Sequence, residues 1–369
     1  MRIVLVGPFP PLRGGISMFN HSLAETLSKN HEVHRISFSL QYPQLLFPGK
    51  TQFFDFEGKQ SKAMINSINP FSWKKTVKFI NSQKPDIVIF QYWMPFFAPA
   101  FASITKGVKK GCGATVIVNC NNITPHESRP LDSAMTARFF NYCDGFVVMS
   151  KTVENDLLKI EPNPKYRRTP HPIYDIFGES IEKQKAKDMI GVTEKKVILN
   201  FGLIRSYKGL DILIESAKLF KNKIDNFKIL VVGECYGDEN KYIQLAEDNG
   251  VSDVIDFRFE FVPNEKVNQY FCAADLVALP YKSATQSGVV PIAYHFDIPV
   301  VVSNVGGLPE VVVDGETGFI CEPNPNSIAD SIVKYFNMNP YFFSQNINEY
   351  KKRFSWDNFV KVVLELVES

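Results

Sequence analysis

The sequence predicts an α/β protein made of two doubly wound parallel-sheet domains. A chain of 369 residues is too long for one compact core and suits two domains. Short apolar runs of β type alternate with helical patterns, which is typical of parallel sheets covered by helices on both faces. The pattern restarts after residue 190. We therefore expect two Rossmann-like sheets that face each other across a cleft.

The expected strands form two series. The first comprises residues 2–7, 32–38, 86–92, 114–121 and 145–150. The second comprises residues 195–202, 227–233, 254–259, 276–280, 299–303 and 318–321. Helical patterns lie between them, among them residues 17–29, 210–223 and 264–274. The proline-rich segment 161–175 is typical of the approach to a linker. We therefore expect an N-terminal domain over 1–180 and a C-terminal domain over 181–353.

Composition narrows the class of protein. Apolar residues make up 45% and charged residues 22% of the chain, which is ordinary for a folded soluble protein. No apolar run reaches the ~18–20 residues that a membrane span needs, and the start lacks the pattern of a signal peptide. The six cysteines are scattered without a CxxC pair, which argues against a disulfide framework or a zinc site. We expect a cytoplasmic protein without a metal.

Charge is divided unevenly along the chain. Residues 1–175 contain 21 lysines and arginines and 12 acidic residues, which gives a net charge of +9. The remaining residues have a net charge of −7. The stretch NPFSWKKTVKFI (69–80) could lie as a helix on an anionic membrane through Lys74, Lys75 and Lys78. The alternative is a solvated amphipathic helix. The chain lacks the arginine-rich strip and stacking aromatics of a nucleic-acid binder, so we expect no nucleic-acid partner.

The loops after the strands carry the candidate chemistry, because open α/β sheets bind ligands beyond the carboxyl ends of their strands. Gly14-Gly15 opens the first helix, where backbone can approach a phosphate closely. The spacing is not GxGxxG, which disfavours a nicotinamide dehydrogenase. A glycine pair that only makes a turn is the alternative. In the loop after the fourth strand, His126 could orient a hydroxyl or act as a base, although a lone histidine is more often structural.

Two loops in the second half could bind a diphosphate. Arg205 and Lys208 follow a strand and could neutralise one, unless they are merely solvated loop charges. The run 283–288 places hydroxyls, an amide and a glycine, with no carboxylate, at an expected helix start. A helix start of this kind favours binding of an anion from a ligand. The alternative is that these residues only cap the helix. The candidate phosphate contacts here are Thr285, Gln286, Ser287 and Gly288. Further candidate donor contacts are Gly306, Gly307 and Glu310, ahead of a turn at Asp314-Gly315.

Several motifs in order resemble a known family. The first-loop GG, GLIRSYKGLDILIESA, LPY…SG…P and SNVGGLPEVVVDGETGF are similar to those of family-4 retaining glycosyltransferases of the GT-B fold. The resemblance implies a nucleotide-sugar donor in the C-terminal domain and a carbohydrate or lipid-linked acceptor in the N-terminal one. It also implies transfer with retention, no cofactor or required metal, and a C-terminal helix (354–369) that returns to the N-terminal domain. Under the glycosyltransferase interpretation, the candidate catalytic residues are His126, Arg205 and Lys208.

The chain departs from that family at one point. Members usually carry two glutamates eight positions apart, and the second usually grips the donor ribose. One alignment places Ala284 and Ile292 there, and a shifted one places Gln286 and Tyr294. Neither recovers a glutamate, so the chain is a variant that lacks the pair. The arginine that usually follows the glycine is also shifted, with Arg205 as the substitute.

The leading hypothesis is a retaining hexosyltransferase of surface polysaccharide or glycolipid synthesis. Its expected place is the cytoplasm, peripherally at the inner face of the membrane. The alternatives are a catalytically silent sugar-nucleotide-binding partner subunit, and another enzyme of the same fold, such as a sugar-nucleotide epimerase.

Overall fold

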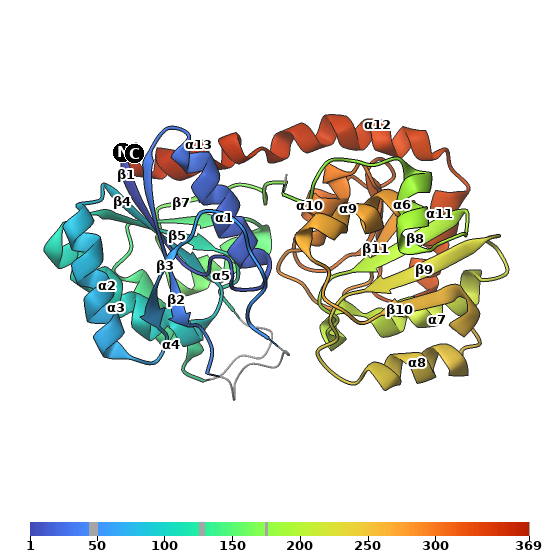
Figure 1. Cartoon of the computed structure of the whole chain (residues 1–369), viewed down its shortest axis with the longest axis horizontal. Coiled ribbons are helices and arrows are strands. Elements are labelled where there is room, and N and C mark those ends of the chain that lie inside the picture. The colour runs from blue at the N-terminus through green and yellow to red at the C-terminus, as the bar shows by residue number, and fades with distance from the viewer. Residues whose placement is uncertain (44–50, 125–129, 174–175, 369) are drawn as a thin grey trace. The chain divides into compact units, whose positions relative to one another are not determined.

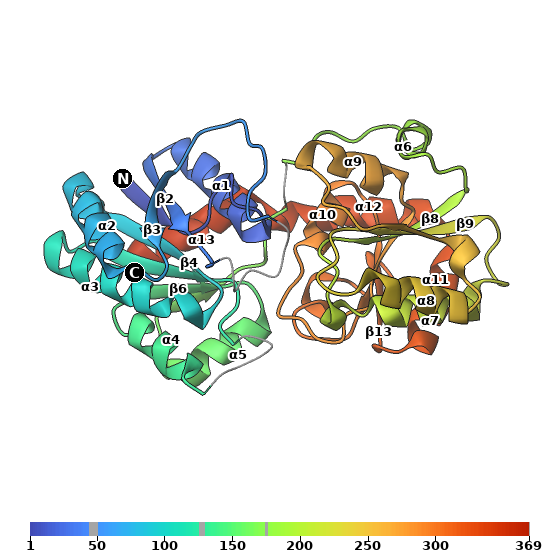
Figure 2. The same cartoon turned by 60° about the horizontal axis from the view of Figure 1, so that its bottom comes forward.

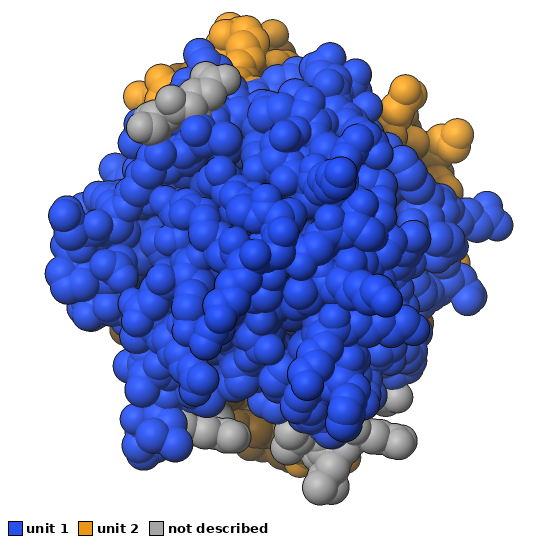
Figure 3. Space-filling view, turned by 90° about the vertical axis from the view of Figure 1, so that its left-hand side faces the viewer, with its two compact units in different colours: residues 1–171, 356–369 blue, residues 172–355 orange. Residues whose placement is uncertain are grey.

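The computed structural model describes residues 1–43, 51–124, 130–173 and 176–368. The chain divides into two compact units, Met1–His171 with Trp356–Ser369 (unit 1) and Pro172–Ser355 (unit 2). Figure 1 traces both along the chain, and Figure 3 colours unit 1 blue and unit 2 orange. The first division falls after His171, ahead of the expected boundary at residue 180, and the chain rejoins unit 1 at Trp356.

Unit 1 is built on a seven-stranded parallel sheet in the order β3-β2-β1-β4-β5-β6-β7. The strands are β1 (Arg2–Val6), β2 (Glu32–Leu40), β3 (Lys62–Asn66), β4 (Ile87–Tyr92), β5 (Thr115–Cys120), β6 (Gly145–Val148) and β7 (Tyr166–Arg168). The helices are α1 (Gly15–Ser28), α2 (Pro70–Gln83), α3 (Ala98–Gly111), α4 (Asp132–Phe140), α5 (Lys151–Ile160) and α13 (Trp356–Glu368). Figure 2 shows these helices on the two faces of the sheet.

The two faces of this sheet are buried against different helices. Alternate strand residues such as Val4, Phe90 and Val118 belong to one core with side chains of α3, α4 and α5. On the other face α13 contacts α1 and strands β5 to β7. Phe19 of α1 lies with its ring centroid 5.0 Å from that of Trp356. This aromatic contact seats the C-terminal helix in unit 1.

Unit 2 is built on a six-stranded parallel sheet in the order β10-β9-β8-β11-β12-β13. The strands are β8 (Lys196–Phe201), β9 (Phe227–Val232), β10 (Ile255–Arg258), β11 (Leu276–Leu279), β12 (Val300–Ser303) and β13 (Gly318–Cys321). The helices are α6 (Lys183–Ile190), α7 (Leu210–Phe220), α8 (Glu239–Asp248), α9 (Asn264–Ala273), α10 (Val289–His295), α11 (Pro325–Phe336) and α12 (Pro340–Tyr350). The strand order reverses between β8 and β11, so a ligand is expected at the carboxyl ends of these two strands.

The fold class expected from the sequence is confirmed, since both units are parallel-sheet α/β bodies and every expected strand is present. Two strands were missed. Strand β3 is half exposed, so its sequence does not contain the continuous apolar run that is expected of a strand buried on both faces. β7 is three residues, YRR, within the segment interpreted as a linker approach. Within the described residues, no helix is long and apolar enough to cross a bilayer.

Candidate functional site

Two loops meet at the carboxyl edge of the unit 2 sheet. The first, 202–209, follows β8, and the second, 280–288, follows β11. Gly209 has a φ of +67°, and a Cβ there would lie 1.9 Å from the carbonyl oxygen of Pro280. The Lys282 backbone N–H donates to the Tyr207 carbonyl at 2.7 Å. Only glycine permits this approach, so the two loops form one rigid edge.

Lys208 lies half-buried at this edge, in a short 3₁₀ turn (Ser206–Lys208). Its Nζ is 5.4 Å from the ring centroid of Tyr281. Among the residues that the structure describes, Lys208 forms no ion pair with a carboxylate. Burial lowers the pKa of its ammonium; Tyr207 opposes this shift and the charge of Arg205 adds to it. Lys208 is thus a cation whose charge is available to a ligand.

Arg205 comes from the same loop and is exposed. Its guanidinium carbon lies 4.8 Å from the ring centroid of Tyr236, in the loop after β9. Two backbone hydrogen bonds join these loops, from Ile204 N–H to the Glu234 carbonyl and from Tyr236 N–H to the Ile204 carbonyl, both 2.9 Å. An aromatic ring therefore lies beside each of the two predicted diphosphate cations.

The helix expected to start at the 283–288 run follows that run directly. Helix α10 begins at Val289, has seven residues and has Gly288 at its N-cap. The Val289 N–H donates to the Ser287 hydroxyl oxygen at 3.2 Å, so this local capping bond satisfies a backbone donor that an anion would otherwise take. So short a helix gives little dipole for an external anion, and any phosphate contact from Thr285, Gln286, Ser287 or Gly288 is therefore a loop contact.

The loop after β12 packs on the 283–288 run. Gly306 has a φ of +54°, and a Cβ there would lie 1.5 Å from the Ala284 carbonyl oxygen. Gly307 is buried beside it, whereas Glu310 is exposed in the 3₁₀ turn Pro309–Val311. The turn expected at Asp314-Gly315 is confirmed, because the Gly315 N–H donates to the Gly318 carbonyl at 2.8 Å. Gly306 therefore supports the 283–288 run.

Unit 1 carries its own candidates. Gly14 and Gly15 are exposed at the start of α1, Gly14 has a φ of +122°, and no acid lies in the first turn. A group of amides at the carboxyl ends of β4 and β5 was missed by sequence reasoning. Buried Gln91 accepts hydrogen bonds through Oε1 from the Nδ2 atoms of Asn119 (2.7 Å) and Asn121 (2.9 Å). Polar residues at the ends of otherwise apolar strands were the available signal. His126 lies outside the described residues.

The candidate membrane contacts lie on α2. Lys74, Lys75 and Lys78 are exposed, and Phe71 is 79% exposed. Trp73 instead faces the protein, because its indole N–H donates to the Asn66 carbonyl at 2.7 Å. The exposed surface of α2 therefore includes three lysines and Phe71.

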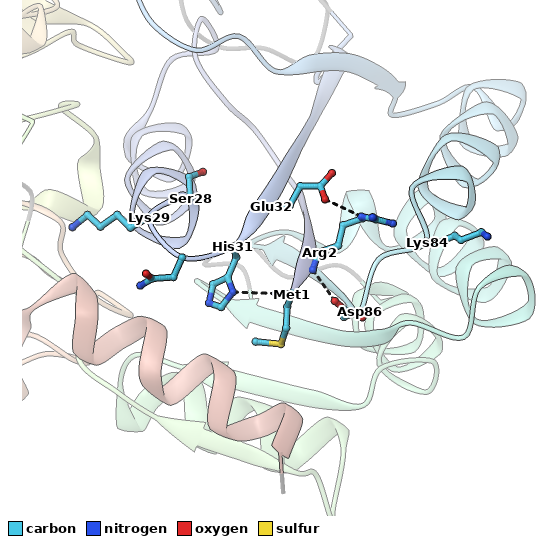
Figure 4. Close-up of a pocket in the computed structure, with 9 residues that line it drawn as sticks. Met1, Arg2, Ser28, Lys29, His31, Glu32, Lys84 and Asp86 are labelled. Carbon is cyan, nitrogen blue, oxygen red and sulfur yellow. Dashed lines mark hydrogen bonds and ion pairs between the residues drawn. The ribbon is translucent and has the colours of Figure 1, made fainter.

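A polar hollow lies at the opposite, amino edge of the unit 1 sheet (Figure 4). Three of its charged residues are engaged with one another: Arg2 Nε is 3.0 Å from Glu32 Oε2, and the Arg2 backbone N–H donates to Asp86 at 2.7 Å. Lys29 and Lys84 also line it. The carboxyl edge of unit 2 is better suited to an anionic ligand, because the strand order reverses there and the loops with Arg205 and Lys208 follow these strands.

Comparison with known proteins points to one class. Residues 181–354 match the family model for glycosyl transferases group 1, and residues 13–173 match glycosyltransferase family 4. An uncharacterised glycosyltransferase of Methanocaldococcus jannaschii is 24% identical, over 98% of this chain and 96% of its own length. The D-inositol 3-phosphate glycosyltransferase of Mycolicibacterium smegmatis is 30% identical over 52% of this chain and 44% of its own.

Solved structures share the fold. Anabaena HepE, in complex with UDP, has a TM-score of 0.78 at 15% identity over 100% of both chains. Sucrose-phosphate synthase from Thermosynechococcus elongatus has a TM-score of 0.75 at 15% identity, over 100% of this chain and 98% of its own. At such identities the likeness shows the GT-B fold alone.

Proposed function

Because this chain belongs to the group 1 glycosyltransferases of the GT-B fold, we propose that its donor is a nucleoside-diphosphate sugar. The proposal includes transfer with retention of anomeric configuration. The observation that carries it is the pair of cations at the carboxyl edge of unit 2. Among the described residues neither Arg205 nor Lys208 has a carboxylate partner, and both follow the central strand at which the strand order reverses.

Such a pair suits the leaving group of the reaction. As the anomeric C–O bond breaks, negative charge grows on the diphosphate, and fixed cations that meet it lower the barrier. Arg205 and Lys208 supply this charge without a metal ion. The loop 285–288 adds hydroxyl and amide groups. The ribose contact that a glutamate makes in related proteins has no counterpart at positions 284, 286, 292 or 294.

Binding of nucleotides tests the donor site. We expect UDP, GDP or ADP to bind more tightly than the matching monophosphate, equally well with magnesium or EDTA, in titration calorimetry. Lys208→Met should weaken diphosphate binding and should lower the turnover of sugar transfer by about 100-fold, as for removal of one oxyanion stabiliser. Lys282→Met is the matched control, since Lys282 is on the neighbouring loop but is already paired with Asp211.

Two results would contradict this assignment. Equal affinity for mono- and diphosphate, or a strict need for magnesium, would exclude a diphosphate held by Arg205 and Lys208. Tight donor binding with no sugar transfer to any acceptor would favour the catalytically silent partner subunit. NMR of the anomeric proton in the product tests retention.

We further propose that unit 1 takes a lipid-linked acceptor at the inner face of a bacterial-type cytoplasmic membrane, in polysaccharide or glycolipid synthesis. The support is the exposed lysines of α2 beside Phe71 and the net charge of +9 over residues 1–175. Each well-placed lysine adds ~1 kcal/mol of attraction to anionic lipid. Lys74, Lys75 and Lys78 together would therefore hold the unit at the bilayer.

Vesicle co-sedimentation tests this surface. Binding to vesicles with anionic lipid should exceed binding to neutral ones, fall with salt, and weaken when Lys74, Lys75 and Lys78 are all changed to glutamine. A triple change of three exposed lysines in unit 2 is the control, and it should leave binding unchanged: Lys185, Lys218 and Lys241. Equal binding to anionic and neutral vesicles at low salt would remove the membrane from the proposal.

A further inference from the structure

Tyr281 lies between the two parts of the proposed diphosphate site. It follows β11 directly, and its side chain is 3% exposed. Its ring centroid is 5.4 Å from Lys208 Nζ, and its hydroxyl oxygen is 3.4 Å from that of Ser287. Burial raises the pKa of the phenol to about 12, so it stays neutral at physiological pH.

An aromatic ring and a carboxylate hold a lysine differently. A carboxylate would fix the ammonium but also cancel its charge, and a diphosphate would have to displace it. The face of a ring attracts a cation through its quadrupole and leaves the full positive charge in place. Lys208 forms no ion pair with a carboxylate among the described residues, so the ring is the group that can direct it.

The backbone around Tyr281 is fixed relative to Lys208. The close approach of Gly209 to Pro280 and the hydrogen bond from Lys282 to Tyr207 bind the two loops on either side of Tyr281. The rings of Tyr207 and Tyr281 also meet edge to face, with centroids 6.2 Å apart. The ring is therefore held in place before any ligand arrives.

We propose that Tyr281 is the positioning residue of the donor-diphosphate site: its ring directs Lys208, and its hydroxyl lies at the edge of the 285–288 loop, beside that of Ser287. This rests on the proposed function and adds a residue to it. Tyr281 acts through Lys208.

Nucleotide titration on purified variants tests the role. The probe is whichever of UDP, GDP and ADP the parent binds best, with its monophosphate. Tyr281→Leu should weaken diphosphate binding by about 10-fold, which lies between the values for an exposed and a desolvated cation–π contact. Monophosphate binding should fall less. Tyr281→Phe keeps the ring and should stay within about 3-fold of the parent, since it loses only one long hydrogen bond.

A double-mutant cycle separates positioning from general damage. In the Lys208→Met background, Tyr281→Leu should cause no further loss of diphosphate affinity, because the cation it directs is gone. Tyr335→Leu is the matched control, a tyrosine of unit 2 equally buried at 3% exposure, with its hydroxyl on the Asp275 carbonyl at 2.7 Å. It should lower the melting temperature comparably and leave diphosphate affinity intact.

The outcomes are distinct. Parent-like diphosphate affinity in Tyr281→Leu overturns the role of Tyr281 and leaves the donor site standing. An equal loss in the parent and Lys208→Met backgrounds also overturns it, because the tyrosine would then be only structural. Parent-like affinity in Lys208→Met overturns the donor site and this inference together. If Tyr281→Leu does not fold, Tyr281→Met fills similar space without a ring and carries the same expectation.

Discussion

Replacing Gly306 with alanine should destabilise unit 2 and weaken the donor site together. The new Cβ would lie 1.5 Å from the Ala284 carbonyl oxygen and 2.5 Å from its carbon. Both are backbone atoms, so no side-chain rotation can relieve the contact. The loop after β12 and the 283–288 run must therefore move apart, and the loop 285–288 moves with them.

The magnitude follows from two costs. The left-handed backbone at φ +54° costs a residue with a Cβ about 1 kcal/mol. Overpacking against an ordered neighbour costs about 1–3 kcal/mol more. For a body the size of unit 2, each kcal/mol lowers the melting temperature by about 2–4 °C, so the fall should be on the order of 10 °C.

Gly315→Ala is the control that isolates the contact. Gly315 is also left-handed, at φ +78°, but a Cβ there meets nothing within 4 Å. It should lose about 1 kcal/mol, or about 3 °C, and keep its diphosphate affinity. Differential scanning calorimetry and nucleotide titration measure both quantities. If Gly306→Ala and Gly315→Ala lose the same stability, the close contact with Ala284 contributes nothing and the reasoning is refuted.

Four further predictions concern Lys208, Tyr236 and His126. Burial lowers the pKa of Lys208, so diphosphate affinity should fall as pH rises through that lowered pKa, and a titration against pH should show no such fall in Lys208→Met. Between the lowered pKa of Lys208 and the ordinary pKa of lysine, the unfolded state binds more protons than the folded state. In this pH range, Lys208 therefore makes the free energy of unfolding rise with pH. Because its burial as a cation costs stability, Lys208→Met should be at least as stable as the parent in denaturant. Tyr236→Leu should weaken diphosphate binding by about 3- to 10-fold through loss of the ring beside Arg205, with recovery in Tyr236→Phe; an unchanged affinity in the leucine variant would show that the ring does not direct Arg205. His126→Ala should lose sugar transfer in a product assay and retain nucleotide binding; loss of both would make His126 structural.

The strand pattern could be predicted from sequence because parallel strands buried on both faces are continuous apolar runs. Prediction from apolar runs failed for strands that are not buried on both faces. Strand β3 is an edge strand whose first two residues are exposed. Strand β7 is held by pairing with β6 although two of its three residues are arginines. The start of α10 could be predicted, because the uncharged polar run 283–288 ends at the N-cap of that helix, Gly288.

The candidate site was predictable in composition and not in arrangement. A glycine pair, two cations and a polar run after strands are local features, and their place at strand ends follows from the α/β pattern. Their neighbours come from elsewhere in the chain: Tyr281 beside Lys208, Tyr236 beside Arg205, and Ala284 against Gly306. The buried amides around Gln91 escaped notice because a single polar residue in an apolar strand has no periodic signal.

By itself, the sequence determined the α/β class, the two series of strands and the loops that bear the charges, because hydrophobic periodicity and turn chemistry are local. Only the tertiary structure decided which groups act together. Sheet order brings β8 next to β11 and separates β10 from β11, although β10 lies closer to β11 along the chain. The charge of Lys208 is left available because an aromatic ring from a distant segment lies beside it where a carboxylate would have cancelled it. Such pairings depend on the packing of the whole sheet, and no local stretch of sequence encodes them.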